Sequence, residues 1–321
     1  MRGRRPSMED RFTIGSRVYA TPGGYGYGYG GGYGYGGEGG GEDYDDDDGG
    51  GGGGGSDVTG GRAGGDDDDD DDDDEDRNST HRIYGIFDGH GGEAAVDFVS
   101  RTLPRRLRAL LAAAPPGQPD GAELRALLAR EILATDAALL RHLSAIGGDE
   151  SGSTCVLAVV SGDSLTVASV GDSRAVVSDG AGRAVQLTTE HKPYLPAERR
   201  RIQRAGGFIR LSGVWRVQGE LAMSRALGDA RLKRLGVITA RADVATADLG
   251  PARQRPPGPR FLLLASDGLW DAVGSQEAAD LARGRADRPL MGARRLATEA
   301  FRRGGGDNVA VLVVRVGGGG R

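Results

Sequence analysis

The fold class is decided by residues 154–178, which read TCVLAVVSGDSLTVASVGDSRAVVS. Three short runs rich in β-branched residues, at 154–161, 164–170 and 174–178, are separated by only two or three residues. Runs of this composition, bounded by glycine and aspartate, are typical of strands. Connections this short reverse the chain, whereas a parallel crossover needs a dozen residues or more. The stretch therefore predicts an antiparallel meander and not alternating β–α–β units.

Helical periodicity lies on both sides of this stretch. Upstream, apolar residues recur every three or four positions over residues 93–114 and again over 124–143, which is the spacing of one helix face. Pro104 lies inside the first of these segments and should kink or split it, because proline removes a helical hydrogen bond. Helices combined with antiparallel strands indicate a layered α+β domain. Further helices are expected at 196–205, 275–285 and 290–303, and further strands at 11–20, 81–87, 260–266 and 308–316.

Residues 21–79 differ in composition from the rest of the chain, because they are rich in glycine and tyrosine and contain runs of aspartate. Residues 21–76 hold 19 acidic residues against Arg62, a charge of −18, so the remainder carries +13 of the net −5. A segment with no periodic apolar face and strong self-repulsion is expected to be disordered. Because loop-closure cost grows only logarithmically with length, we expect it to expand the tip of a hairpin.

The remaining composition excludes several classes of protein. Residues 1–11 are basic and polar and lack the apolar stretch of a signal peptide, and no apolar run approaches the ~18 residues of a membrane helix. Cys155 is the single cysteine, so no intrachain disulfide can form, which fits a reducing compartment. This cysteine lies in an apolar run, without the phosphate-binding loop of a cysteine phosphatase. No interleaving of aromatic and basic residues suggests a surface for stacking nucleic-acid bases.

Acidic residues recur where predicted strands meet glycines. One such residue would ordinarily be a turn or capping aspartate, but here the pattern occurs at six places. Oxygen ligands with few histidines suit Mg²⁺ or Mn²⁺ better than zinc. Two such ions ~3.5–4 Å apart lower the pKa of a water molecule between them and clamp a phosphoryl group. The six places are Glu9–Asp10, Asp88, Asp172, Asp267, Asp271 and Asp307.

Eight motifs, in order along the chain, resemble those of the metal-dependent serine/threonine protein phosphatases of type 2C. The resemblance covers residues 4–316 apart from the insert, and 191–229 is most similar to the epsilon, or protein phosphatase 1-like, branch. It implies a four-layer α/β/β/α sandwich with two central antiparallel β-sheets. The motifs are GRRPSMEDRF, GIFDGHGG, GSTC, VASVGDSRAVV, HKPYLPAERRRIQRAGGFI, GVWRVQGELAMSRALGD, LLLASDGLWDAV and GGGDNVAVLVV.

The same resemblance implies one catalytic domain, formed by residues 1–20 and 80–317. Residues 21–79 would be an insertion in a hairpin loop of that domain, and 318–321 would be a tail. The chain begins four residues before Arg5, whereas the family usually has residues upstream that complete a first strand. Some relatives of the 1-like branch carry a membrane anchor there, so a longer form of the protein is expected to be attached to a membrane.

The resemblance also implies the ligands of two Mg²⁺ or Mn²⁺ ions. At the matching motif positions, Asp88 corresponds to the carboxylate that bridges both ions, and Gly89 corresponds to a backbone-carbonyl ligand. Glu9 is expected to bind one of the ions. Asp267 and Asp307 are expected to bind the other.

Five further roles are implied by position in the motifs. Asp10 corresponds to an acid that holds metal-bound water, and Asp172 and Asp271 correspond to a third, weaker metal site. Arg5 corresponds to the phosphate-binding arginine, whose fork can bind two phosphate oxygens. On its own sequence context His90 is a hydrogen-bonded structural residue. The family resemblance makes it the proton donor to the leaving oxygen, a role suited to an imidazole that titrates near neutrality.

The expected activity is hydrolysis of phosphoserine and phosphothreonine in proteins by direct attack of a dimetal-bound water, without a phosphoenzyme. Intracellular signalling, including stress-activated kinase signalling, is the expected context. A second interpretation is a catalytically weak pseudophosphatase or scaffold that binds partners through the acidic insert. A third is another two-metal hydrolase, such as a nuclease. Under the first interpretation the partners are phosphorylated proteins and no nucleic acid, and the protein is expected to be a monomer in the cytoplasm or nucleus.

Overall fold

The computed structural model describes Met1, Arg5 and residues 7–14, 81–114, 119–250, 260–284 and 288–316. The insertion expected at 21–79 and the tail at 318–321 lie outside the described residues, so both stay predictions. Residues on either side of the insertion belong to paired strands of one sheet.

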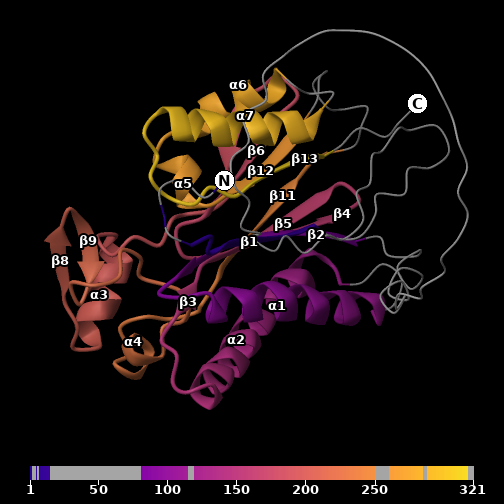
Figure 1. Cartoon of the computed structure of the whole chain (residues 1–321). Helices are drawn as coiled ribbons and strands as arrows, with labels where there is room; N and C mark the ends of the chain where they lie inside the picture. Colours follow the sequence, from indigo (N-terminus) through magenta and orange to yellow (C-terminus); the bar gives the residue numbers. More distant parts are fainter. Residues whose placement is uncertain are drawn as a thin grey trace, which may run out of the picture. The chain divides into compact units, whose positions relative to one another are not determined.

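The first sheet joins strands from both sides of the insertion (Figure 1). β1 (Asp10–Ile14) pairs with β2 (His81–His90), β2 pairs also with β4 (Cys155–Ser161), and β4 pairs with β5 (Ser164–Val170). Every pairing in this sheet is antiparallel, as the short connection between β4 and β5 predicts. The strand order is β10-β3-β2-β4-β5-β11, with β1 beside β2. The remaining strands are β3 (Gly152–Ser153), β10 (Leu227–Gly228) and β11 (Asp243–Asp248).

The second sheet is also antiparallel, with the order β13-β12-β6-β7. It corrects the meander expected at 154–178, because β6 pairs with β12 and β7 whereas β5 pairs with β4 and β11. The connection at 171–173 therefore leads from one sheet to the other. Gly171 permits this corner with a φ of 98°, which side chains with a Cβ rarely adopt. The strands are β6 (Arg174–Ser178), β7 (Ala184–Gln186), β12 (Phe261–Ala265) and β13 (Val311–Arg315).

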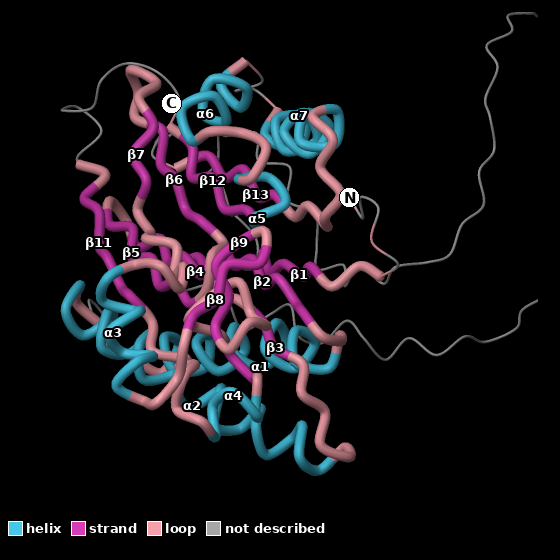
Figure 2. Tube along the Cα trace, turned by 90° about the vertical axis from the view of Figure 1, so that its left-hand side faces the viewer, coloured by secondary structure: helices cyan, strands magenta, loops and turns pink. Residues whose placement is uncertain are grey.

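Two pairs of helices cover the outer faces of the sheets, as Figure 1 and the turned view in Figure 2 show. α1 (Ala94–Ala112) and α2 (Gly121–Ala145) lie on the first sheet, and α6 (Ser275–Arg283) and α7 (Pro289–Arg302) lie on the second. The arrangement is a four-layer α/β/β/α sandwich with two central antiparallel sheets, which confirms the expected fold class. The smaller elements are α3 (Pro196–Arg204), β8 (Ile209–Ser212), β9 (Val214–Val217), α4 (Ala230–Arg234) and α5 (Asp267–Trp270).

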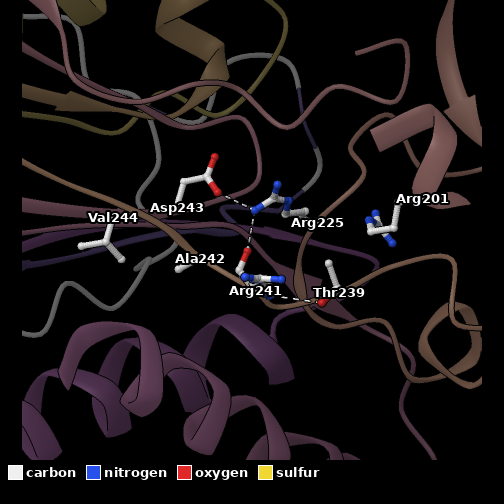
Figure 3. Close-up of a pocket in the computed structure, with 7 residues that line it drawn as sticks. All are labelled: Arg201, Arg225, Thr239, Arg241, Ala242, Asp243 and Val244. Carbon is white, nitrogen blue, oxygen red and sulfur yellow. Dashed lines mark hydrogen bonds and ion pairs between the residues drawn. The ribbon is translucent and has the colours of Figure 1, made fainter. Parts of the chain in front are cut away.

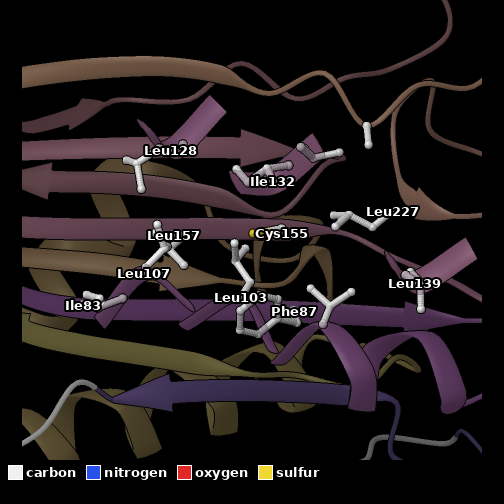
Figure 4. Packing of buried hydrophobic residues seen from close by; sticks show 14 of the residues in the cluster. Ile83, Phe87, Leu103, Leu107, Leu128, Ile132, Leu139, Cys155, Leu157 and Leu227 are labelled. Carbon is white, nitrogen blue, oxygen red and sulfur yellow. The ribbon is translucent and has the colours of Figure 1, made fainter. Parts of the chain in front are cut away.

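Separate apolar clusters fill the spaces between the layers. The cluster between the first sheet and its helices is drawn in Figure 4, where Leu103 and Leu107 of α1 lie against Phe87 and Leu157 of the sheet. Cys155 is buried in the same cluster, and burial raises its pKa to about 12. A thiol in this environment stays protonated and inert, which agrees with its interpretation as a small apolar residue.

Helix α1 runs through Pro104 as one continuous helix, so of the kink or split expected there, the split is wrong. Val99, Leu103 and Leu107 are all fully buried against the sheet. Burial of these side chains stabilises the helix by about 1.5–3 kcal/mol each, which outweighs the roughly 3 kcal/mol that an internal proline costs. None of the described helices is both long enough and apolar enough to span a membrane.

Candidate metal centre

The pairing of β1 with β2 places Asp10 directly opposite Asp88. The sequence predicts that β2 ends at Phe87, but the strand continues through Asp88 to His90. The extra residues pair with β1 and β3, whose backbones satisfy their hydrogen bonds. The acidic and imidazole side chains therefore project from a rigid strand and not from a turn.

Gly89 brings the backbones of β1 and β2 into close contact. Its N–H donates to the carbonyl of Glu9 over 3.0 Å. A Cβ at position 89 would lie 2.7 Å from that carbonyl oxygen and 2.9 Å from Cγ1 of Val96, which is too close for any side chain. Glycine is therefore required here to hold Glu9 beside Asp88.

The end of the second sheet meets the same point. Ser266, between β12 and α5, donates its hydroxyl proton to Oδ2 of Asp10 over 2.9 Å and accepts from the N–H of Ala310 over 3.0 Å. Asn308 accepts from the N–H of Glu9 over 2.7 Å. Asp267 immediately follows Ser266 in the sequence, and Asp307 immediately precedes Asn308. Both sheets therefore contribute carboxylates to one site.

We call Asp10, Asp88, Asp172, Asp267 and Asp307 the carboxylate cluster, because their charges act on one another. Burial, and then the charges of its four neighbours, raises the pKa of Asp88 well above its usual range. Burial, with the charge of Asp172 next, raises the pKa of Asp267 to about 7. Burial also raises the pKa of Asp10 to about 6, against the hydrogen bond from Ser266. These shifts are those of carboxylates gathered in a desolvated site without enough positive charge.

The carboxylate cluster fits divalent cations by its donor chemistry. Oδ1 of Asp10 and Oδ1 of Asp172 are buried and have no hydrogen-bond partner among the described residues, so each has a free lone pair for a hard cation. Within the described ranges, however, no three acidic, histidine or cysteine side chains are arranged as a finished metal site. Two carboxylates of the cluster are instead paired with cationic side chains.

Those two cationic side chains are Arg5 and Lys192. Arg5 lies 2.7 Å from Oδ2 of Asp307, with 59% of its side chain exposed. Lys192 lies 2.6 Å from Oδ2 of the buried Asp172, and no motif in the sequence marks this lysine. Asp271, which the resemblance adds to a third metal site, has its pKa raised by burial and by Asp172, against the charge of Lys192.

His90 is held by a residue that sequence reasoning missed. Its Nε2 lies 2.9 Å from Oδ2 of Asp229. Burial lowers the pKa of His90, but the hydrogen bond and charge of Asp229, then the charges of Asp172 and Glu9, outweigh burial and raise it. Asp229 follows Gly228 at the end of β10, so the signal that marked the other carboxylates was present there too.

A hollow of about 390 Å³ lies away from these carboxylates, around β11 (Figure 3). Two of its three lining arginines form ion pairs: Arg225 binds Glu198 over 2.7 Å and Asp243 over 2.8 Å, and Arg201 binds Glu198 over 3.0 Å. We call Glu198, Asp243, Arg201 and Arg225 the arginine cluster. Because these four charges pair with one another, the arginine cluster shows none of the unbalanced charge found around Asp88.

Comparison with known sequences identifies a single family. The family model for protein phosphatase 2C matches residues 66–309. Protein phosphatase 1L of Bos taurus is 45% identical over 240 residues, which are 74% of this chain and 65% of that protein. Probable protein phosphatase 2C 2 of Arabidopsis thaliana is 36% identical over 241 residues, 73% of this chain and 59% of that protein. The chain thus spans about three fifths of the length of these relatives.

Solved structures share the fold. A serine-threonine phosphatase 2C from Toxoplasma gondii superimposes with a TM-score of 0.59 at 24% identity, covering 74% of this chain and 85% of that one. A C. elegans sex determining protein gives a TM-score of 0.68 at 20% identity, covering 98% of this chain and 63% of that one. Both the sandwich and the family are those that the eight sequence motifs resemble.

Proposed function

Because this chain belongs to the protein phosphatase 2C family, we propose that it hydrolyses phosphoserine and phosphothreonine in proteins, with Mg²⁺ or Mn²⁺ as cofactor. The observation that carries the proposal is the carboxylate cluster. Burial, and then like charges, raise the pKa of Asp88 and of Asp267, so the folded chain holds these groups together at a cost in stability. Divalent cations would neutralise that charge.

The proposed ligands are the residues that the strand ends bring together. Glu9, Asp88 and the Gly89 carbonyl would serve one ion, and Asp267 and Asp307 would serve the other, with Asp88 common to both. Asp10, fixed by Ser266, would orient water beside them. Asp172 and Asp271 would form the weaker third site. When bound, such cations lower the pKa of a water molecule and offset negative charge on a phosphoryl group.

Arg5 and His90 have separate tasks in the proposed reaction. Arg5 would exchange Asp307 for two oxygens of the phosphate, since a guanidinium fork fits either partner. His90 would give a proton to the seryl or threonyl oxygen as its bond to phosphorus breaks, and the imidazolium becomes neutral imidazole. The raised pKa of His90 keeps that proton available near neutral pH.

The test is a metal-dependence assay on the full chain, with a phosphothreonine peptide taken from the activation loop of a stress-activated kinase. Wild type should be inactive in EDTA and active in Mn²⁺. Asp88→Asn should lower turnover by more than about 100-fold, since even residues behind the ligands typically contribute 10–100-fold. Asp248→Asn, an exposed aspartate on β11, is the matched control and should retain activity. Wild-type turnover by Asp88→Asn in Mn²⁺ would reject the assignment.

The acidic insert is strongly charged, so the scaffold interpretation is also tested, with the same assay. A variant lacking residues 21–79 should hydrolyse the peptide as wild type does if the sandwich is the enzyme. Loss of partner capture with no measurable hydrolysis in either chain would instead support a scaffold. The deletion also removes the acidic runs, which would otherwise add loosely bound Mn²⁺ to a calorimetric titration of the carboxylate cluster.

A further inference from the structure

The contact between His90 and Asp229 joins two distant parts of the chain, 139 residues apart. Asp229 is nearly enclosed, with 8% of its side chain exposed, and His90 is 24% exposed. Nε2 is the ring nitrogen that binds Asp229, whereas the buried Nδ1 has no hydrogen-bond partner among the described residues. The carboxylate therefore fixes which of the two nitrogens stays free.

Asp229 adopts a backbone conformation that favours glycine. Its φ and ψ are both 50°, in the left-handed region, and Gln218 is the one other described non-glycine residue with a positive φ. Strain of this kind persists only where the surroundings impose it, and it concentrates at functional sites. A glycine would relieve the strain, so the aspartate side chain must be needed for another reason.

That reason is not helix capping. Asp229 stands at the N-cap of α4, yet its side chain makes no capping hydrogen bond. Its carboxylate is directed to His90 instead. An aspartate at this position ordinarily accepts from the first turn of its helix, so the contact with the imidazole replaces the local one.

Three surrounding elements hold Asp229 in place. Its N–H donates to the carbonyl of Ser151 over 3.0 Å. Asp136 of α2 accepts from the N–H of Gly228 over 2.9 Å and also pairs with Lys233 of α4. A Cβ at Gly152 would collide with both His90 Nε2 and Asp229 Oδ2, so β3 leaves just enough room for the two side chains.

We propose that Asp229 is a positioning residue for His90: its carboxylate anchors Nε2 and fixes the ring and its tautomer, so that the imidazole is held in place to deliver a proton to the leaving oxygen. This inference rests on the proposed function, because it assumes that His90 is the proton donor. The logic is that of a carboxylate that orients a catalytic imidazole without itself exchanging a proton.

The experiment uses two substrates of different leaving-group chemistry and the full chain in Mn²⁺. The oxygen leaving a phosphothreonine peptide needs a proton, whereas that of p-nitrophenyl phosphate leaves as a stable anion. His90→Ala should lower kcat on the peptide by at least about 100-fold and alter kcat on the aryl ester far less. Asp229→Asn and Asp229→Gly should lower peptide kcat by about 10- to 100-fold, with KM and aryl-ester kcat within about 3-fold.

Asp229→Gly separates positioning from folding, because glycine accepts the left-handed backbone. Its melting temperature should stay close to that of wild type, because relief of the backbone strain offsets the lost contact with His90. When His90→Ala is already present, an added substitution of Asp229 should cause no further loss of kcat on the peptide. In metal-free wild type at a pH where the imidazole is neutral, ¹⁵N NMR should find the proton on Nε2, and Asp229→Gly should lose that preference. Asp248→Asn is the control that should change none of these readouts.

Each result distinguishes this inference from the function on which it rests. If His90→Ala is selectively defective on the peptide but the Asp229 variants are not, the positioning role is wrong and the proton-donor role stands. Equal losses on both substrates in the Asp229 variants would mean a merely structural contact and would also overturn the inference. If His90→Ala shows no peptide-selective defect, the proton-donor role itself fails, and the positioning role fails with it.

Discussion

The carboxylate cluster and the arginine cluster are both partly buried groups of charge, but they are balanced in opposite ways. In the carboxylate cluster, burial and like charges raise the pKa of Asp88 and of Asp267. In the arginine cluster, burial raises the pKa of Glu198, but Arg225 and Ser224 outweigh it and lower the pKa to about 2. The hydrogen bond from His191 lowers the pKa of Asp243 well below its usual range. The charges of the arginine cluster are paired within the chain, whereas the carboxylate cluster needs positive charge from outside the chain.

The difference shows where folding and function compete in this molecule. Paired charges stabilise the folded chain relative to the unfolded one, whereas crowded carboxylates destabilise it until a cation binds. The two regions are linked through His191, which is bonded to Asp243 through Nε2 and accepts from the N–H of Gly171 through Nδ1, next to Asp172. The balanced cluster thus supports the loop that carries part of the unbalanced one.

The largest effect on stability is expected from Glu198→Gln, which breaks the balanced cluster. Glu198 is 4% exposed, and its replacement leaves Arg225 and Arg201 without their shared partner. Breaking a buried pair in this way costs about 3 kcal/mol of unfolding free energy, which urea denaturation would measure. Glu150→Gln, an exposed carboxylate that also binds two arginines, is the control and should cost less than about 1 kcal/mol. Equal losses in the two variants would contradict the comparison.

In the metal-free protein, Asp88→Asn is expected to raise the unfolding free energy, whereas Glu198→Gln lowers it. Removing one charge from the carboxylate cluster relieves repulsion, and the new amide can donate to Asp10 on the opposing strand. We expect the unfolding free energy to rise in EDTA, because burial and the neighbouring carboxylates raise the pKa of Asp88 well above its usual range. Added Mn²⁺ should stabilise wild type and have little effect on the variant. A loss of metal-free stability in Asp88→Asn would show that the cluster is not under electrostatic strain.

The sequence marks the members of the carboxylate cluster by a local pattern, whereas no local pattern marks the arginine cluster. Asp88, Asp267 and Asp307 stand beside glycines at strand ends, a local pattern that can be read from residue order. Glu198 and Arg225 meet only because α3 packs beside the segment before β10, and no spacing along the chain encodes that contact. Asp229 is intermediate, since it has the local pattern but its partner depends on the fold.

The fold shows the same division between local and distant information. The strands of the core are predicted because their apolar runs are continuous, as in β4 and β12. The change of sheet after β5 is not predicted, because three residues suffice equally for a hairpin and for a corner. β11 has only exposed and half-buried residues and lies at a sheet edge, so its sequence, DVATAD, carries too little apolar signal to be recognised.

The smallest effect, and the one that tests both clusters together, is the pH dependence of metal-free stability. The pKa of Glu198 is lowered from 4.5 to about 2, so its contribution is complete above pH 4.5 and is lost as the pH falls through 2. The pKa of Asp267 is raised from 3.8 to about 7, so its contribution is complete below pH 3.8 and is lost as the pH rises through 7. In EDTA, stability should therefore be greatest near pH 4–5 and fall on each side, more steeply toward neutral pH than toward acid pH.

Urea midpoints at pH 3, 5 and 7 would separate the two limbs of this profile. Glu198→Gln should flatten the change between pH 3 and 5, because glutamine does not titrate. Asp267→Asn should flatten the fall between pH 5 and 7 and leave the acid limb in place. Mn²⁺ should abolish the same fall in wild type, since a bound cation keeps the carboxylates ionised without penalty. If metal-free wild type instead became more stable from pH 5 to 7, the carboxylate cluster would be balanced within the chain, and the contrast between the two regions would fail.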